Sequence, residues 1–101
     1  MKSIIGIIPA RYASTRFPGK PLAQIMGMSM LHRVYTQAKG AKSLNEVIIA
    51  TDDKRILDHA REIGAPAVLT GAHHPSGTDR CFEALRSLGK NFDYVINIQG
   101  D

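Results

Sequence analysis

Three cations and several turn-forming residues stand together directly after a short apolar run near the amino terminus. The stretch at residues 8–21 reads IPARYASTRFPGKP and contains Arg11, Arg16 and Lys20. In a parallel α/β sheet, ligands bind outside the carboxyl ends of the strands, where loop N–H groups form an anion-binding concavity. Arginine and lysine make charge-assisted hydrogen bonds to phosphate oxygens. We therefore predict that this loop binds the phosphates of a nucleotide, and a solvated basic turn is the alternative.

The spacing of this loop excludes two common phosphate-binding motifs. Neither G-x-x-x-x-G-K-[ST] nor G-x-G-x-x-G occurs in the sequence. Those motifs are the fingerprints of P-loop nucleotidases and of dinucleotide-binding proteins. The sequence therefore gives no support to either class.

A carboxylate, Asp101, follows the last apolar run of the chain. Mg²⁺ usually takes one or two carboxylates together with phosphate oxygens of the substrate. Asp101 is thus a candidate magnesium ligand, although an exposed terminal turn also explains it. Asp52 or Asp53 could supply a second carboxylate, but a role as helix N-cap explains this pair better.

The stretch from Ser76 to Arg80 reads SGTDR and precedes an apolar helical stripe. Its hydroxyl and amide groups can cap the helix or meet a polar ligand at the positive helix end. Gly77 would let a ligand approach the backbone closely, and Arg80 adds a cation. Both interpretations of this stretch stay open.

The remaining residues with reactive side chains favour structural roles. His73 and His74 are adjacent, diverge, and have no partner at zinc-ligand spacing. His32 and His59 are expected at the surface or at the boundary of the core. Cys81 lies on the apolar stripe of its helix, which predicts a core residue and not a nucleophile.

The elements that must position these residues are four short runs rich in β-branched side chains. They cover residues 4–8, 47–50, 67–69 and 94–98. The first two are almost continuously apolar, as strands of a parallel sheet buried on both faces are. The sequence predicts four parallel strands.

Apolar residues recur at helical spacing between these runs, from Leu31 to Ala38, from Ile56 to Ile63 and from Cys81 to Leu88. Glycines that end the three predicted helices follow at positions 40, 64 and 89. The predicted caps are Asp52 or Asp53 for the second helix and Ser76 or Thr78 for the third.

Strict alternation of strand and helix predicts a doubly wound, Rossmann-like α/β sheet with right-handed crossovers. All four strand ends then lie on one edge. Arg11, Asp52 and Asp101 should surround one crevice at that edge.

Composition bounds the class of protein. The chain has 101 residues, of which 44% are hydrophobic and 22% charged, and a formal net charge of +4. This predicts one small globular domain, without linker or repeat, that suits an anionic small molecule better than nucleic acid. A single cysteine excludes an intrachain disulfide, and no apolar run approaches the roughly 18 residues that span a bilayer. We expect a cytosolic protein.

Three motifs closely resemble the 3-deoxy-manno-octulosonate cytidylyltransferases, or CMP-Kdo synthetases, along the whole chain. They are IPARYASTRFPGKPL at residues 8–22, HPSGTDR at residues 74–80 and NIQGD at residues 97–101. Related CMP-sialate synthetases share the Pro-Ala-Arg start but usually continue with Gly-Gly-Ser-Lys. The sequence that follows Arg11 here favours the Kdo branch and a fold of the nucleotide-diphospho-sugar transferase type.

The resemblance implies an enzyme that couples CTP and Kdo, with Mg²⁺, to CMP-Kdo and pyrophosphate for lipopolysaccharide synthesis. Arg11 and Lys20 would hold the triphosphate, and Asp101 would bind Mg²⁺. Ser14 and Arg16 would shape the loop. The resemblance also places one residue, Gln99, facing the sugar. The residues it places near the cytidine are Ala10, Ser76, Gly77 and Arg80.

Family members run well beyond the NIQGD motif, into a region with a second metal carboxylate, most of the sugar pocket and the usual homodimer contacts. We therefore expect residues 1–101 to be the amino-terminal part of a longer catalytic domain, with little activity alone. A nucleotidyltransferase for another acidic sugar and a non-catalytic nucleotide- or phosphate-binding module are the alternatives.

Overall fold

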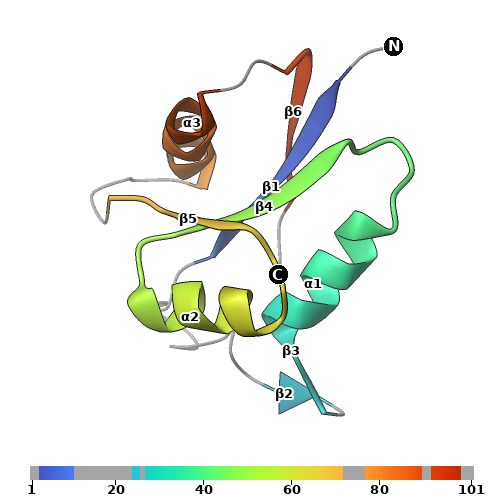
Figure 1. Ribbon diagram of the computed structural model, residues 1–101, viewed down its shortest axis with the longest axis vertical. Coiled ribbons are helices and arrows are strands. Elements are labelled where there is room, and N and C mark those ends of the chain that lie inside the picture. The colour runs from blue at the N-terminus through green and yellow to red at the C-terminus, as the bar shows by residue number, and fades with distance from the viewer. Residues whose placement is uncertain (1–2, 11–23, 26, 72–76, 90–91, 99–101) are drawn as a thin grey trace.

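The computed structural model describes residues 3–10, 24–25, 27–71, 77–89 and 92–98. From α1 onwards, helices and strands alternate along these ranges (Figure 1). The strands are β1 (Ile4–Ala10), β2 (Gln24–Ile25), β3 (Met28–Ser29), β4 (Glu46–Thr51), β5 (Ala67–Leu69) and β6 (Tyr94–Asn97). The helices are α1 (Met30–Lys39), α2 (Lys54–Glu62) and α3 (Gly77–Leu88).

Four of the strands form one parallel sheet in the order β5-β4-β1-β6. The first strand therefore lies inside the sheet, between the strand that follows α1 and the strand that follows α3. If the four parallel strands are numbered 1 to 4 along the chain, their order across the sheet is 3-2-1-4, which is the arrangement of a doubly wound sheet. The predicted α/β fold is confirmed.

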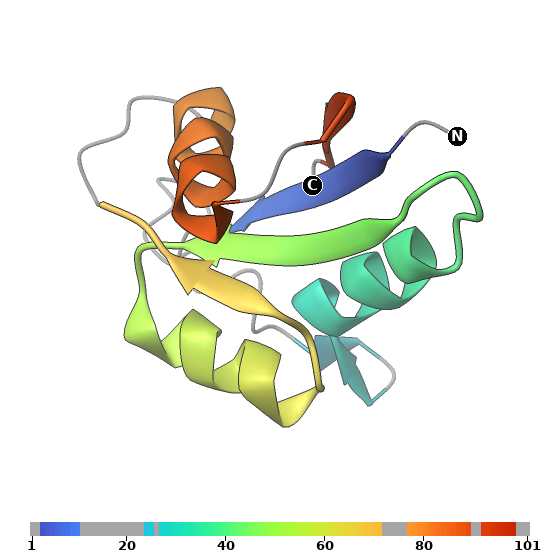
Figure 2. The ribbon, with the colours of Figure 1, turned by 45° about the horizontal axis from the view of Figure 1, so that its top comes forward.

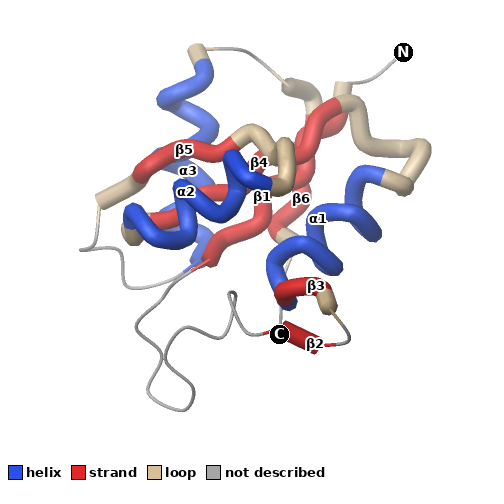
Figure 3. Tube along the Cα trace, turned by 60° about the horizontal axis from the view of Figure 1, so that its bottom comes forward, coloured by secondary structure: helices blue, strands red, loops and turns tan. Residues whose placement is uncertain are grey.

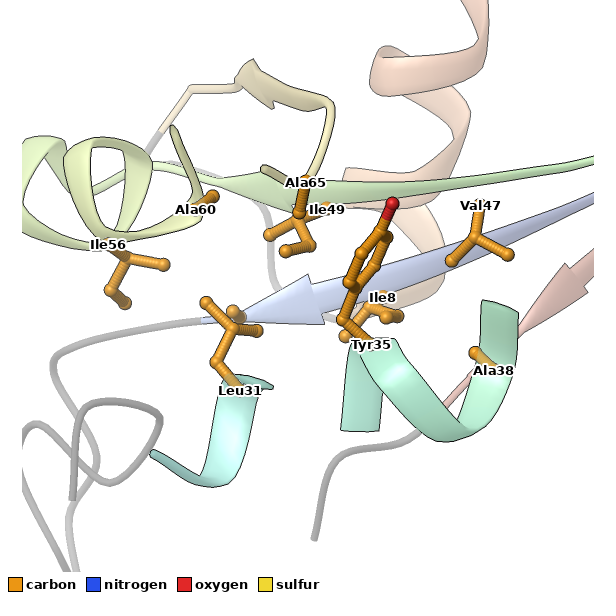
Figure 4. Close-up of a cluster of buried hydrophobic side chains, with 10 residues drawn as sticks. Ile8, Leu31, Tyr35, Ala38, Val47, Ile49, Ile56, Ala60 and Ala65 are labelled. Carbon is orange, nitrogen blue, oxygen red and sulfur yellow. The ribbon is translucent and has the colours of Figure 1, made fainter. Parts of the chain in front are cut away.

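The helices cover the two faces of this sheet separately. Helices α1 and α2 lie on one face and α3 lies on the other (Figure 2). The first face buries a cluster that includes Ile8, Val47 and Ile49 against Leu31 and Tyr35 (Figure 4). Because successive strand residues point to opposite faces, the second face presents Ile5, Ile7, Ile48 and Ala50 to Cys81 and Ala84 of α3.

Strands β1 and β4 are almost entirely buried, as their continuous apolar sequences predict. The edge strand β6 differs. Tyr94, Val95 and Ile96 are 50%, 42% and 43% exposed. Because neighbouring strand residues face opposite sides, apolar side chains are exposed on both faces of β6 in the described part of the chain.

A short antiparallel hairpin, β2 and β3, precedes α1 and was not predicted from the sequence. It lies at the start of α1 (Figure 3). Gly27 at the turn has φ +85°, a conformation that favours glycine. The next element begins at once, because Ser29 ends β3 and is the N-cap of α1, where its hydroxyl accepts a 3.0 Å hydrogen bond from the His32 N–H.

Most of the predicted helix ends are correct. Gly64 and Gly89 have φ +76° and +64° and follow the ends of α2 and α3. Gly40 is different, because it is the C-cap of α1 itself with a helical φ of −74° and not the residue beyond it. Asp53, and not Asp52, caps α2. Of the two caps predicted for α3, Thr78 already lies inside the helix and Ser76 lies outside the described residues.

Candidate functional site

The carboxyl ends of three parallel strands lie side by side. Ala10 of β1 is in register with Thr51 of β4, which is in register with Leu69 of β5. The strand order reverses between β1 and β6, because β4 and β5 lie on one side of β1 and β6 on the other. In open α/β sheets, ligands bind beside the carboxyl ends of the strands at such a switch point. We call this part of the molecule the carboxyl edge.

The amino end of α3 belongs to this carboxyl edge. The Cys81 thiol lies 4.0 Å from the carbonyl oxygen of Ile7, so this part of α3 lies over the middle of β1. The preceding residue, Arg80, reaches the ends of β4 and β5. The positive end of a helix therefore stands beside the switch point.

Arg80 is 1% exposed. Its Nη1 donates to Thr70 Oγ1 at 2.6 Å and to the Gly71 carbonyl at 3.2 Å. Its Nη2 lies 3.7 Å from the Asp52 carboxylate, while its Nε has no hydrogen-bond partner among the described residues. Arg80 is thus a buried cation that joins α3 to the ends of β4 and β5, and not a cation that projects into solvent.

Gly71 is held from both sides by α3. Its carbonyl accepts from Arg80, and its N–H donates to both carboxylate oxygens of Glu83 at 3.2 and 3.1 Å. The preceding residue is also fixed, because the Thr70 N–H donates to the Thr51 carbonyl at 2.7 Å. Side chains of one helix therefore determine where the chain leaves β5.

Three of the predicted site residues lie at this carboxyl edge. Ala10 is the last residue of β1 and is buried, and Gly77 is the first residue of α3, one turn before Arg80. The other predicted site residues lie outside the described ranges, as do His73 and His74. They are Arg11, Ser14, Arg16, Lys20, Ser76, Gln99 and Asp101. The roles of all the predicted site residues, described or not, stay predictions.

Both carboxylates considered as a second metal ligand already have partners. Asp53 accepts from the Arg55 N–H at 2.8 Å, and the hydrogen bond from the Arg55 side chain lowers the pKa of Asp53. Asp52 faces Arg80. Among the residues that the structure describes, no group of three or more His, Cys, Asp or Glu side chains is arranged to hold a metal ion. Nothing here therefore favours a metal role for either aspartate.

Cys81, His32 and His59 lie as their sequence positions indicate. Cys81 is 5% exposed, and burial raises the pKa of its thiol to about 11, as expected for a core residue. His32 and His59 are half-buried. His59 Nε2 lies 2.6 Å from Ser29 Oγ, so this boundary histidine joins α2 to the N-cap of α1.

Sequence reasoning missed Thr70, Glu83 and the burial of Arg80. One signal was available, because Arg80 stands four residues before Ala84 and shares its side of α3. Ala84 is fully buried. The same signal could not identify the partners of Arg80, because these depend on where the carboxyl ends of β4 and β5 lie relative to α3.

A doubly wound sheet with a helix amino end at the switch point places the chain among the Rossmann-like α/β proteins. No helix in the described part of the chain has the length and apolar character needed to cross a membrane. The family model for cytidylyltransferases matches residues 5–101. The chain therefore belongs to the cytidylyltransferase family.

Relatives with established names extend this result. The chain is 57% identical over 99 residues to the 3-deoxy-manno-octulosonate cytidylyltransferase of Cytophaga hutchinsonii, covering 98% of this chain and 40% of the relative. It is 50% identical over 98 residues to the mitochondrial enzyme of the same name from Arabidopsis thaliana, covering 97% of this chain and 34% of the relative. The chain spans about two fifths of the length of the first relatives that it matches.

Solved structures agree on the fold. A CMP:2-keto-3-deoxy-manno-octonic acid synthetase complexed with CTP matches with a TM-score of 0.92 and 41% identity, over 98% of this chain and 40% of that chain. A cytidylyltransferase from Leptospira borgpetersenii matches with a TM-score of 0.81 at 22% identity, over all of this chain and 42% of that chain. The second likeness concerns the fold alone.

Proposed function

We propose that the protein transfers the cytidylyl group of CTP to 3-deoxy-manno-octulosonate, giving CMP-Kdo and pyrophosphate for lipopolysaccharide synthesis. The observation that carries the proposal is the similarity of almost the whole chain to proteins named for this reaction, at 50–57% identity. The solved relative in complex with CTP supports the same nucleotide. A carboxyl edge that presents a helix amino end beside β1 suits a nucleotide.

In this proposal the anomeric hydroxyl of the sugar attacks the α-phosphorus of CTP. A bond forms between that oxygen and the phosphorus, the bond to the β-phosphate bridging oxygen breaks, and pyrophosphate leaves with its electron pair. The hydroxyl proton passes to solvent or to a nearby base. Such a transfer requires positioning and charge neutralisation more than covalent chemistry by the protein.

The proposed roles follow the motifs. Arg11 and Lys20 hold the triphosphate and the leaving pyrophosphate, while Ser14 and Arg16 shape their loop. Gln99 faces the sugar. The residues proposed near the cytidine are Ala10, Ser76, Gly77 and Arg80.

Mg²⁺ completes the proposal, with Asp101 as its protein ligand. A carboxylate with substrate phosphates is the donor set that Mg²⁺ prefers, and the bound ion would neutralise charge on the leaving group. Asp52 is left out of this ligand set because it lies 3.7 Å from the Arg80 guanidinium. On the same resemblance we propose a cytoplasmic homodimer.

A lysine substitution in the complete gene product tests the proposal. Lys20→Ala should lower CMP-Kdo formation about tenfold or more, because a hydrogen bond to a charged group contributes about 1.5–3 kcal/mol. Lys42→Ala is the matched control, since Lys42 is exposed in the turn that leads to the opposite end of β4. The assay follows pyrophosphate release with CTP, Kdo and Mg²⁺.

The same assay, together with equilibrium titration of the nucleotides, separates the alternatives. Turnover with another acidic sugar and not with Kdo would redirect the proposal to that substrate. Equal and salt-sensitive binding of CTP, ATP and GTP without turnover would refute it in favour of a polyphosphate-binding module.

A further inference from the structure

Two charged side chains of α3 converge on a single residue at the end of β5. Arg80 donates to the Gly71 carbonyl at 3.2 Å, and the Glu83 carboxylate accepts from the Gly71 N–H at 3.1 and 3.2 Å. Residues three apart lie on the same side of a helix, so both contacts come from one face of α3. We call these contacts the Gly71 clamp.

The Arg80 side of the Gly71 clamp is buried. Arg80 is 1% exposed, and its partners are Thr70 Oγ1 at 2.6 Å and the Asp52 carboxylate at 3.7 Å. A buried cation is tolerated only where hydrogen bonds and counter-charge meet it, and apolar packing at such a position is often as stable or more so. The guanidinium contacts groups that follow β4 and β5, so it ties both strand ends to α3.

That geometry bears on the carboxyl edge. The contact of Cys81 with the Ile7 carbonyl sets the first turns of α3 over β1, beside the switch point. A ligand there would meet the N–H groups of the first turn of α3, so the placement of that turn affects how tightly the ligand binds. Gly77, the first residue of α3, is one turn from Arg80.

We propose that Arg80 and Glu83 are positioning residues, which hold Gly71 and the amino end of α3 in the relative placement that binds CTP. This inference rests on the proposed function. Arg80 acts through the backbone and the strand ends that it holds, and Glu83 completes the same clamp from the next turn of the helix.

The experiment compares three variants of the complete gene product. Glu83→Ala removes both acceptor oxygens for the Gly71 N–H, whereas Glu83→Gln keeps one. Thr70→Val removes the hydroxyl that Arg80 contacts at 2.6 Å and nearly conserves shape. Arg86→Ala is the control, because it removes an exposed cation from the same helix.

Three readouts are taken. Amide hydrogen exchange at Gly71 reports the clamp, equilibrium titration with CTP reports nucleotide binding, and steady-state kinetics separate KM from kcat. We expect Glu83→Ala to raise exchange at Gly71 and to raise both the Kd and the KM for CTP about tenfold, the equivalent of one hydrogen bond to a charged group. The expected change in kcat is less than about threefold. Glu83→Gln should recover part of the affinity, and Thr70→Val should weaken CTP binding in the same direction.

Three outcomes would overturn the inference. CTP affinity that stays within twofold of wild type while exchange at Gly71 rises would make the clamp a stabilising contact alone. Unchanged exchange and affinity in both Glu83→Ala and Thr70→Val would show that the clamp does not act in solution. An equal loss in Arg86→Ala would indicate general destabilisation of α3.

The proposed function fails on different evidence. A wild-type protein that binds CTP but does not turn over Kdo refutes the reaction, and the CTP titration of Glu83→Ala then decides the positioning role by itself. A wild-type protein that does not bind CTP refutes both.

Discussion

Cys81 is placed where a thiolate is unfavourable. It packs with Ile5, Ile7 and Ala84 between α3 and the sheet, and burial raises its pKa from 9.0 to about 11. Two pKa units make the thiolate about a hundredfold rarer at a given pH below 9 than in an exposed thiol. This residue therefore serves packing, and reagents that need a thiolate should react with it slowly in the native protein.

The raised pKa predicts a stability change at alkaline pH. Because the native state binds the thiol proton more tightly than the unfolded state, the contribution is fully present below about pH 9 and is lost as the pH rises towards 11. Urea unfolding at pH 8 and pH 10.5 should show a larger loss of stability in wild type than in Cys81→Ala, which has no thiol to ionise. Parallel losses in the two proteins would contradict the prediction.

Individual residues differ in how far their sequence context defines them. The core position of Cys81 followed from its place on an apolar stripe, and its 5% exposure agrees. The neighbouring Arg80 was predicted to lie near a bound ligand, which stays a prediction, and the burial of its guanidinium against Thr70 and Asp52 was not predicted. Hydrophobic periodicity indicates which side of a helix is buried, but it does not reveal which polar groups of other elements contact that side.

At the scale of elements, Ser29 connects three of them. It ends β3, caps α1 through the His32 N–H at 3.0 Å, and lies 2.6 Å from His59 of α2. Ser29 is 2% exposed, so water cannot easily replace these contacts. One hydroxyl thus sets the start of α1 against α2 on the same face of the sheet.

Removing this hydroxyl should destabilise the fold. We expect Ser29→Ala to lower the free energy of unfolding by about 1–2 kcal/mol, the usual cost of a lost N-cap. Ser43→Ala is the control, because Ser43 is exposed in the turn before β4. A double-mutant cycle with His59→Ala, measured by urea unfolding, should show coupling between the two residues, whereas additive effects would mean that their contact contributes nothing.

The strands of the parallel sheet were predictable from the sequence and the hairpin was not. The predicted strand at 67–69 matches β5, and the runs at 4–8 and 47–50 fall within β1 and β4. The hairpin of β2 and β3 has two residues in each strand, too few to show an alternating pattern. The role of Ser29 as the cap of α1 was missed with it, because no polar residue before the stripe was recognised as a helix start.

For the whole molecule, the exposure of β6 has a measurable effect. An exposed apolar strand at a sheet edge offers apolar surface to other chains. We expect a protein of residues 1–101 to self-associate with rising concentration in sedimentation velocity, and Val95→Lys to weaken this association. Ala41→Lys, which adds the same charge at an exposed position outside the sheet, should not. A monomer at all concentrations would contradict the prediction.

The arrangement of the sheet was only partly accessible from the sequence. Continuous apolar character correctly predicted that β1 and β4 are buried on both faces. The run that became β6 has similar composition but is exposed, because α3 carries the chain to the far side of β1. The candidate site residues were predicted mainly from sequence motifs. The contacts around Gly71 were not predicted, because they depend on how the elements are placed in three dimensions.

The central place of β1 also governs how the protein is made. Its neighbour β6 ends at Asn97, 46 positions after the end of β4, and at roughly 5–20 residues per second the ribosome needs about 2–9 s to add them. Throughout that interval β1 lacks the neighbouring strand that pairs with one of its edges. Chaperones that recognise isoleucine-rich nascent segments would find their target in the first ten residues, and synonymous codons that slow translation between positions 51 and 97 should prolong that exposure.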